Sequence, residues 1–219
     1  MSDIGFFSNE MIGIVGSGDN YESFSQREVR LCRINEFSKR QPIMHKKKVI
    51  RGYYCKDQYA IVCEDKTYIH QSYIAKENKP YLKFSTENNP RGIAALSRDP
   101  EISIALILGQ VEGRVKVVNL ADREVEKQAR SFEAFKGQEI TALALSTNGK
   151  LIAVASNEGC TIRIFDTKSL TLVREFLRGR SPAIMDYLSF ENDDSQLVVS
   201  SEKGTIHIFL VGDDDEKSN

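Results

Sequence analysis

Residues 140–166, ITALALSTNGKLIAVASNEGCTIRIFD, hold the pattern that decides the fold. Three apolar segments, Ile140–Ser146, Leu151–Ser156 and Thr161–Asp166, follow one another with only short polar, glycine-containing connections between them. Short runs rich in β-branched and apolar residues that are bounded by such connections are typical of antiparallel strands. The stretch therefore predicts a small antiparallel sheet.

The same arrangement recurs along the chain. The apolar centres of the last strand in each copy are Leu31, Ile69, Val117, Ile164 and Ile208, which are 38, 48, 47 and 44 residues apart. A period of roughly 40–45 residues is that of a propeller blade, which is itself a short antiparallel sheet. One stretch, Ala121 to Arg130, has a helix-like composition, but it is charged and lacks a sustained apolar stripe. The sequence predicts an all-β propeller with about five blades rather than a parallel α/β fold.

Composition narrows the classes of function. The 219 residues are 41% hydrophobic and carry a net charge of -1, so no bulk charge draws the chain to nucleic acid. The four cysteines and three histidines have no zinc-ligand spacing, and we expect no metal, no cofactor and an intracellular, reduced protein. With no signal peptide and no long apolar run predicted, membrane contact would be peripheral. The glycines of Gly16-Ser17-Gly18 and the basic run His45–Lys48 are interpreted as turns.

Four stretches carry a resemblance to a known family. They are Asn89–Ser97, Ala155–Phe165, Glu175–Gly179 and Ser200–Phe209. In this order they resemble the PROPPIN family, the WIPI-type WD-repeat propellers of autophagy that bind phosphatidylinositol 3-phosphate and the 3,5-bisphosphate. The resemblance covers nearly the whole chain and is most specific after Asn89.

The resemblance also implies missing parts. Family members are usually seven-bladed, whereas this chain is expected to begin at the second blade and to stop inside the sixth. We expect a partial propeller over residues 1–211 and an acidic, disordered tail over residues 212–219, where the family's membrane-inserting loop would follow. An incomplete ring leaves edge strands to be covered by another chain or by further sequence.

One phosphate-binding pocket is predicted from the residues themselves. Arginine holds phosphate through a planar fork of charged donors, and hydroxyl and imidazole groups complete such a site. Because alternate side chains of a strand share a face, Thr205 and His207 should point the same way while Ile206 and Ile208 pack inward. The predicted phosphoinositide-binding residues are Arg178, Ser200, Ser201, Thr205 and His207.

A second pocket is predicted to be degenerate. The resemblance places Leu177 where the family has an arginine, Phe135 where it has a histidine and Cys160 where it has a threonine. The residues that remain for this pocket are Ser156, Arg163 and Arg180. Arg180 shares the side of Arg178 if the connector stays extended, and Gly179 could bend it.

Three functions are compatible with these patterns. The first is a phosphoinositide-reading propeller that recruits autophagy proteins from the cytoplasm to autophagosomal-precursor, endosomal or vacuolar membranes. The second is a protein-interaction scaffold that keeps the fold with reduced or lost lipid binding, which Leu177 and Phe135 favour. The third is an enzyme, which is disfavoured because no Ser/His/Asp order, metal cluster or complete phosphate loop occurs.

Overall fold

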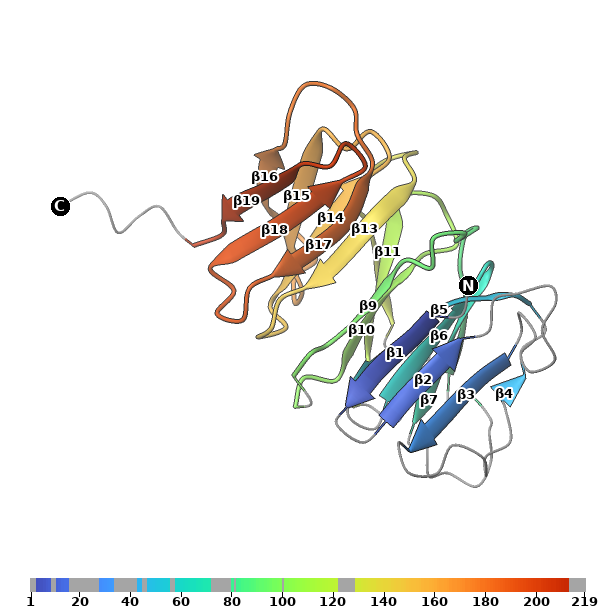
Figure 1. Cartoon of the computed structure of the whole chain (residues 1–219). Helices are drawn as coiled ribbons and strands as arrows, with labels where there is room; N and C mark the ends of the chain where they lie inside the picture. Colours follow the sequence, from blue (N-terminus) through green and yellow to red (C-terminus); the bar gives the residue numbers. More distant parts are fainter. Residues whose placement is uncertain are drawn as a thin grey trace. The chain divides into compact units, whose positions relative to one another are not determined.

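The structure is a computed structural model that describes residues 3–8, 11–15, 28–33, 43–44, 47–55, 58–71, 80, 82–99, 101–121 and 129–212. The chain divides into two compact units, residues 1–92 and 93–219. Every regular element in the described ranges is a β-strand, and neighbouring strands within a sheet are antiparallel (Figure 1). The predicted all-β class is therefore confirmed.

The first unit contains two four-stranded sheets. Strands β1 (Asp3–Ser8), β2 (Met11–Val15), β3 (Glu28–Arg33) and β4 (Ile43–Met44) form one, and β5 (Val49–Cys55), β6 (Gln58–Cys63), β7 (Lys66–Gln71) and β8 (Leu82–Ser85) form the other. Strand β6 is buried along nearly its whole length because it lies inside the second sheet and is apolar on both faces. The ring of Tyr59 on β6 stacks on His70 of β7 at a centroid distance of 4.7 Å.

The second unit contains three sheets. The first holds β9 (Ala94–Leu96), β10 (Ile104–Leu108), β11 (Arg114–Asn119) and β12 (Arg130–Glu133). The middle sheet holds β13 (Ile140–Leu145), β14 (Leu151–Ser156), β15 (Thr161–Asp166) and β16 (Leu172–Leu177), and the last sheet holds β17 (Met185–Phe190), β18 (Gln196–Ser201) and β19 (Ile206–Leu210). The stretch from Ala121 to Arg130 had a helix-like composition, but Arg130 is the first residue of strand β12. Residues 122–128 of this stretch lie outside the described residues.

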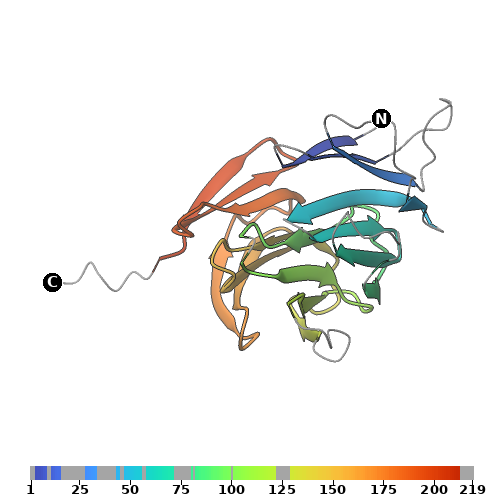
Figure 2. The ribbon, with the colours of Figure 1, turned by 90° about the horizontal axis from the view of Figure 1, so that it is seen from below.

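Two apolar cores join the three sheets of the second unit. One core lies between the first and middle sheets and includes Leu106, Val117 and Val154; the other lies between the middle and last sheets and includes Ile164 and Val199. Figure 1 and Figure 2 both show the middle sheet between its two neighbours. Because the middle sheet packs on both faces, its strands read as continuous apolar runs rather than as alternating patterns.

Polar side chains also tie these sheets together. The carboxylate of Asp194, from the last sheet, accepts hydrogen bonds from the backbone amides of Thr147 and Asn148 in the middle sheet, at 2.6 and 2.9 Å. The guanidinium of Arg98 donates to the carbonyl of Phe190 at 3.2 Å and to the hydroxyl of Ser189 at 2.6 Å. These bonds fix the turns of one sheet against the strands of another.

The outer face of the last sheet corrects one prediction. Ile206 and Ile208 were expected to pack inward, but their side chains are 71% and 60% exposed, and Leu210 on the same face is 68% exposed. The opposite face of β19 carries His207 and Phe209, which pair with the buried Val199 and Leu197 of β18. Both faces of a propeller sheet are built to contact a neighbouring sheet, so the apolar residues of β19 do not by themselves reveal which face is covered.

Candidate functional site

The predicted site lies at the junction between the middle and last sheets, on facing sides of β16 and β19. We call this junction the β16/β19 seam and define it by the pair Phe176 and Phe209, whose rings stack at a centroid distance of 4.9 Å with 22° between their planes. Arg178 follows Phe176 by two residues, and His207 precedes Phe209 by two residues. Arg174 before Phe176 donates to the carbonyl of Gly212 after Phe209 at 3.1 Å, so the two strands run in opposite directions along the seam. Arg178 and His207 therefore lie toward the other, shared end of the seam.

Three of the predicted donors form one hydrogen-bonded chain at that end of the seam. The hydroxyl oxygens of Ser201 and Thr205 are 2.9 Å apart, and the Thr205 hydroxyl is 3.2 Å from Nε2 of His207. The turn between β18 and β19 sets this geometry, because the amide of Ser201 donates to the carbonyl of Thr205 at 3.1 Å and the amide of Gly204 donates back to Ser201 at 2.9 Å. The structure thus brings Ser201, Thr205 and His207 together.

Arg178 is held by backbone oxygens rather than by a carboxylate. Its Nε donates to the carbonyl of Gly159 at 2.7 Å and its Nη2 donates to the carbonyl of Ser181. Its own amide donates to the carbonyl of Cys160 at 2.8 Å, which anchors the end of β16. A guanidinium has five N–H donors, so both donors on Nη1 and one on Nη2 remain for a ligand. In the described part of the chain, no hydrogen bond links Arg178 to Ser201, Thr205 or His207.

Glycine is required where Arg178 meets the neighbouring turn. Gly159 has φ of +58°, and a Cβ there would lie 1.6 Å from the carbonyl oxygen of Ala183. No other residue type fits so close to another backbone. The carbonyl of Gly159 is thereby fixed between the two sheets, where it receives the Arg178 guanidinium.

Ser200 does not join the other predicted residues. It pairs with Ile206 of β19 and Tyr187 of β17, both of which point to the exposed outer face of the last sheet. Successive residues of a strand point to opposite faces, so Ser200 faces away from the seam that Ser201 faces. The geometry removes Ser200 from the candidate site.

The predicted degenerate pocket lies on the other face of the middle sheet, and its arginine is already engaged. Nε of Arg163 is 2.6 Å from a carboxylate oxygen of Glu175, and Nη1 donates to the carbonyl of Ala134 at 2.8 Å. Its guanidinium carbon also lies 4.4 Å from the centre of the Phe135 ring. A cation–π contact and an ion pair therefore occupy the group that would hold a phosphate.

The remaining predicted residues are accounted for individually. Leu177 pairs with Thr161 on the face that carries Arg163, and its side chain is 65% exposed. Ser156 is buried at the end of β14. Arg180 is exposed, and a Cβ on the adjacent Gly179 would meet open space. Cys160 contributes its carbonyl, which accepts the amide of Arg178.

The sequence reasoning missed the role of Glu175. Arg163 and Glu175 stand directly opposite each other on adjacent strands, which becomes visible only when the register of β15 with β16 is known. Among the described residues, no cluster of three histidine, cysteine or acidic side chains could hold a metal ion. The same residues include no helix that is both long and apolar enough to cross a membrane.

Comparison with known proteins identifies the family. The sequence profile of the PROPPIN family matches residues 30–217. Autophagy-related protein 18 of Dictyostelium discoideum is 32% identical over 215 residues, which cover 94% of this chain and 53% of that protein. SVP1-like protein 2 of Pichia angusta is 34% identical over 151 residues, which cover 68% of this chain and 41% of that protein. The chain therefore spans about half the length of the curated relatives it matches.

Solved structures share the fold at low sequence identity. Hsv2 of Kluyveromyces lactis matches with a TM-score of 0.80 and 19% identity over 97% of this chain and 62% of that chain. A complex of KlAtg21 with the coiled-coil of AgAtg16 matches with a TM-score of 0.76 and 19% identity over 92% of this chain and 63% of that chain. The fold is thus a partial β-propeller whose five described sheets correspond to blades, as predicted. The family resemblance of the sequence is confirmed, and the chain belongs to the PROPPIN family.

Proposed function

We propose that this chain is a peripheral membrane protein of autophagy that binds phosphatidylinositol 3-phosphate or the 3,5-bisphosphate at the β16/β19 seam and serves there as a recruitment platform. The observation that carries the proposal is the arrangement of donors at one end of that seam. Ser201, Thr205 and His207 are already linked by hydrogen bonds, and Arg178 lies just after the facing strand β16 with three unused N–H donors. Hydroxyl, imidazole and guanidinium donors together suit a phosphate monoester.

We expect the chain to have one strong lipid site, at the β16/β19 seam, rather than two. Arg163 is engaged by Glu175, Ala134 and Phe135, so a lipid phosphate would have to displace an ion pair to reach it. A charge-assisted hydrogen bond contributes roughly 1.5–3 kcal/mol, and the loss of a second site can cost ~10²–10⁴ in avidity. We therefore expect weak membrane binding by this chain alone, at autophagosomal-precursor, endosomal or vacuolar membranes.

The family supports a non-catalytic role in autophagy. Relatives of this chain carry the name autophagy-related protein 18, and a structural neighbour was solved with a coiled-coil protein. We propose by analogy that this chain also recruits protein partners. Residues 1–211 are proposed to form the propeller part; Asp213–Asn219 of the predicted acidic tail lie outside the described residues.

The alternative is a scaffold that has lost useful lipid affinity. The engaged state of Arg163 and the exposed Leu177, which stands in place of an arginine, favour it. This reading requires protein partners but no phosphoinositide.

Liposome flotation separates the two functions. Vesicles with phosphatidylinositol 3-phosphate, with the 3,5-bisphosphate or with unphosphorylated phosphatidylinositol are each mixed with wild type and with Arg178→Ala/His207→Ala. We expect the wild type to float with the phosphorylated lipids and the double variant to lose most of this fraction. Arg114→Ala is the control, because it removes a half-buried arginine of β11 in the first sheet of the unit, away from the seam, and should float normally. Equal flotation of wild type and double variant would refute the lipid site, and no flotation of wild type with intact partner pull-down would favour the scaffold.

A further inference from the structure

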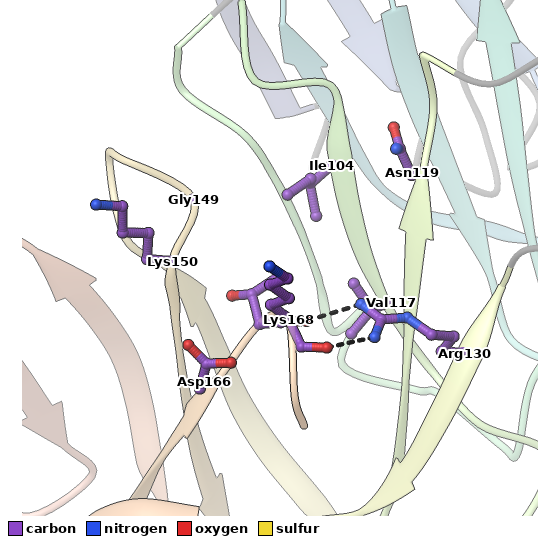
Figure 3. A pocket seen from close by; sticks show the side chains of 9 residues that line it. Ile104, Val117, Asn119, Arg130, Gly149, Lys150, Asp166 and Lys168 are labelled. Atoms are coloured by element: carbon purple, nitrogen blue, oxygen red, sulfur yellow. Dashed lines mark hydrogen bonds between the residues drawn. The ribbon is translucent and has the colours of Figure 1, made fainter. Parts of the chain in front are cut away.

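A cavity lies in the same unit, at the other end of β16 from the seam. Its volume is about 390 Å³, and it opens between the first and middle sheets where strands β15 and β16 are joined by a turn (Figure 3). Strand β16 leads from this end, at Leu172, to Leu177, and Arg178 at the seam follows directly. Six residues at about 3.3 Å each separate the two sites by about 20 Å. A membrane bound at the seam would therefore leave this cavity for a different ligand.

The rim of the cavity is basic. Arg130, Lys150 and Lys168 all line it and are all exposed. The one acidic lining residue is Asp166, and its carboxylate accepts hydrogen bonds from the amide and hydroxyl of Ser169 at 2.6 and 2.8 Å. The lining thus includes three cationic residues and one carboxylate, although the whole chain has a net charge of only -1. The excess is local and favours an anionic ligand.

Arg130 fixes the shape of this rim. It reaches from β12 across to the β15–β16 turn and donates to the carbonyls of Lys168 and Thr167 at 2.5 and 2.9 Å, as Figure 3 shows. Carbonyl oxygens are neutral, so these bonds hold the guanidinium in place without cancelling its charge. Lys168 lies in the same turn, lines the cavity and is exposed.

The wall of the cavity is apolar apart from one hydroxyl. Val117 is buried and Ile104 is partly buried, and both line the cavity. Thr167 also lines it and is only 6% exposed, yet its hydroxyl has no hydrogen-bond partner among the described residues. A buried hydroxyl without a partner is unfavourable, so a ligand that supplies a partner gains affinity.

We propose that this cavity binds an acidic peptide segment of a protein partner. An aliphatic or aromatic side chain of the segment packs on Ile104 and Val117, flanking carboxylates bind Arg130, Lys150 and Lys168, and a polar atom of the peptide meets the Thr167 hydroxyl. The cavity volume is at the small end of the 300–1,000 Å³ range of ligand sites, which suits one side chain with its flanking backbone. An apolar wall below a cationic rim suits such a segment better than it suits a phosphate headgroup, which has no apolar part to bury.

Selection from a random peptide library tests the proposal without a known partner. A phage-displayed library of twelve-residue peptides is panned on wild type and on Lys150→Glu/Lys168→Glu. We expect wild type to enrich peptides with an apolar residue between aspartates or glutamates, and the variant to lose them. The best peptide is then labelled and titrated by fluorescence anisotropy, where Kd should rise at least ten-fold in the variant. Thr167→Val, which removes the hydroxyl and keeps the side-chain shape, should raise Kd by a smaller factor.

Two controls keep the test sharp. Lys136→Glu/Lys203→Glu makes the same charge change at exposed lysines outside the cavity and should bind the peptide as wild type does. Arg178→Ala/His207→Ala should also bind normally, so that failure of the lipid site and failure of this site are distinguishable. The proposal is overturned if no acidic motif is enriched, or if the selected peptide binds wild type and Lys150→Glu/Lys168→Glu equally. It is also overturned if no peptide is selected and wild type floats with phosphatidylserine vesicles whereas Lys150→Glu/Lys168→Glu does not. The rim of the cavity would then bind lipid.

Discussion

Substitutions at Leu177 and Glu175 test whether these two residues weaken lipid binding in the pocket that we predict to be degenerate. The change is Leu177→Arg together with Glu175→Gln. Leu177 is 65% exposed and lies on the same face as Arg163, so an arginine there reaches solvent without disturbing a core. The glutamine keeps the shape of residue 175 and frees Arg163 from its ion pair. We expect the double variant to bind vesicles with phosphatidylinositol 3-phosphate more tightly than wild type.

The structure sets the size of the expected gain. The two groups of the Arg163–Glu175 pair have side chains that are 34% and 42% exposed, so its loss should cost less than about 1 kcal/mol of unfolding free energy. Each new charge-assisted bond to phosphate contributes roughly 1.5–3 kcal/mol, which is about 10–150-fold in affinity. The gain in binding should therefore exceed the loss in stability.

Vesicle titration followed by sedimentation measures the gain, and urea unfolding checks that the variant is folded. Leu172→Arg/Glu175→Gln is the matched control, because it adds the same charge to an exposed site at the other end of β16. An increase of ten-fold or more that is confined to Leu177→Arg/Glu175→Gln is expected. If both double variants gain equally, bulk charge explains the effect; if neither gains, Leu177 and Glu175 are not what closes the pocket.

Three further predictions concern the fold that supports these sites. Asp194→Ala removes the carboxylate that caps two backbone amides of the β13–β14 turn, and should lower the unfolding free energy in urea by about 1–3 kcal/mol; an unchanged midpoint would contradict this. Burial, with nearby carboxylates, raises the pKa of the Cys63 thiol to about 12, so this thiol should not react with Ellman's reagent at pH 8 in the native protein. Native wild type and native Cys63→Ala should therefore give the same number of reactive thiols, and one thiol fewer in the variant would contradict this. Hydrogen bonds from Ser169 lower the pKa of Asp166, so its carboxylate stabilises the fold above about pH 4 and this contribution fades as pH falls through the lowered pKa. Ser169→Ala should raise that pKa in an NMR titration, and no shift would refute the assigned cause.

The strands could be predicted because their signals are local. Leu151–Ser156 and Thr161–Asp166 were predicted with the bounds that the structure gives to β14 and β15. Apolar and β-branched residues end there at polar, glycine-containing turns, and the repeat spacing then indicates blades. The donor chemistry of Arg178, Thr205 and His207 was also visible in the residues themselves, whereas the departures at Leu177, Phe135 and Cys160 were visible only through the family resemblance.

The faces of the last sheet could not be predicted in the same way. Ile206 and Ile208 were expected inside, yet His207 and Phe209 face the middle sheet. Hydrophobicity marks both faces of a blade, so only the register and the position of the neighbouring sheet decide which face is covered. For the same reason Ser200 was grouped with Ser201, although Ser200 lies on the outer face of the last sheet and Ser201 faces the seam.

The basic cavity had no signal in the sequence. Its lining comes from the first and middle sheets, with Arg130 on β12 and Lys168 in the β15–β16 turn. These residues are far apart in the chain and resemble ordinary surface charges one at a time. Their meeting depends on how two sheets pack, which a local pattern does not encode.

The number of lipid molecules bound per chain tests the central claim most directly. Isothermal titration calorimetry with a soluble short-chain phosphatidylinositol 3-phosphate should give one site per chain, and Arg178→Ala/His207→Ala should abolish the heat of binding. Arg163→Ala should leave the stoichiometry at one, since Arg163 is engaged within the protein. Two sites per chain, or a single site that survives the seam variant and is lost in Arg163→Ala, would contradict the account.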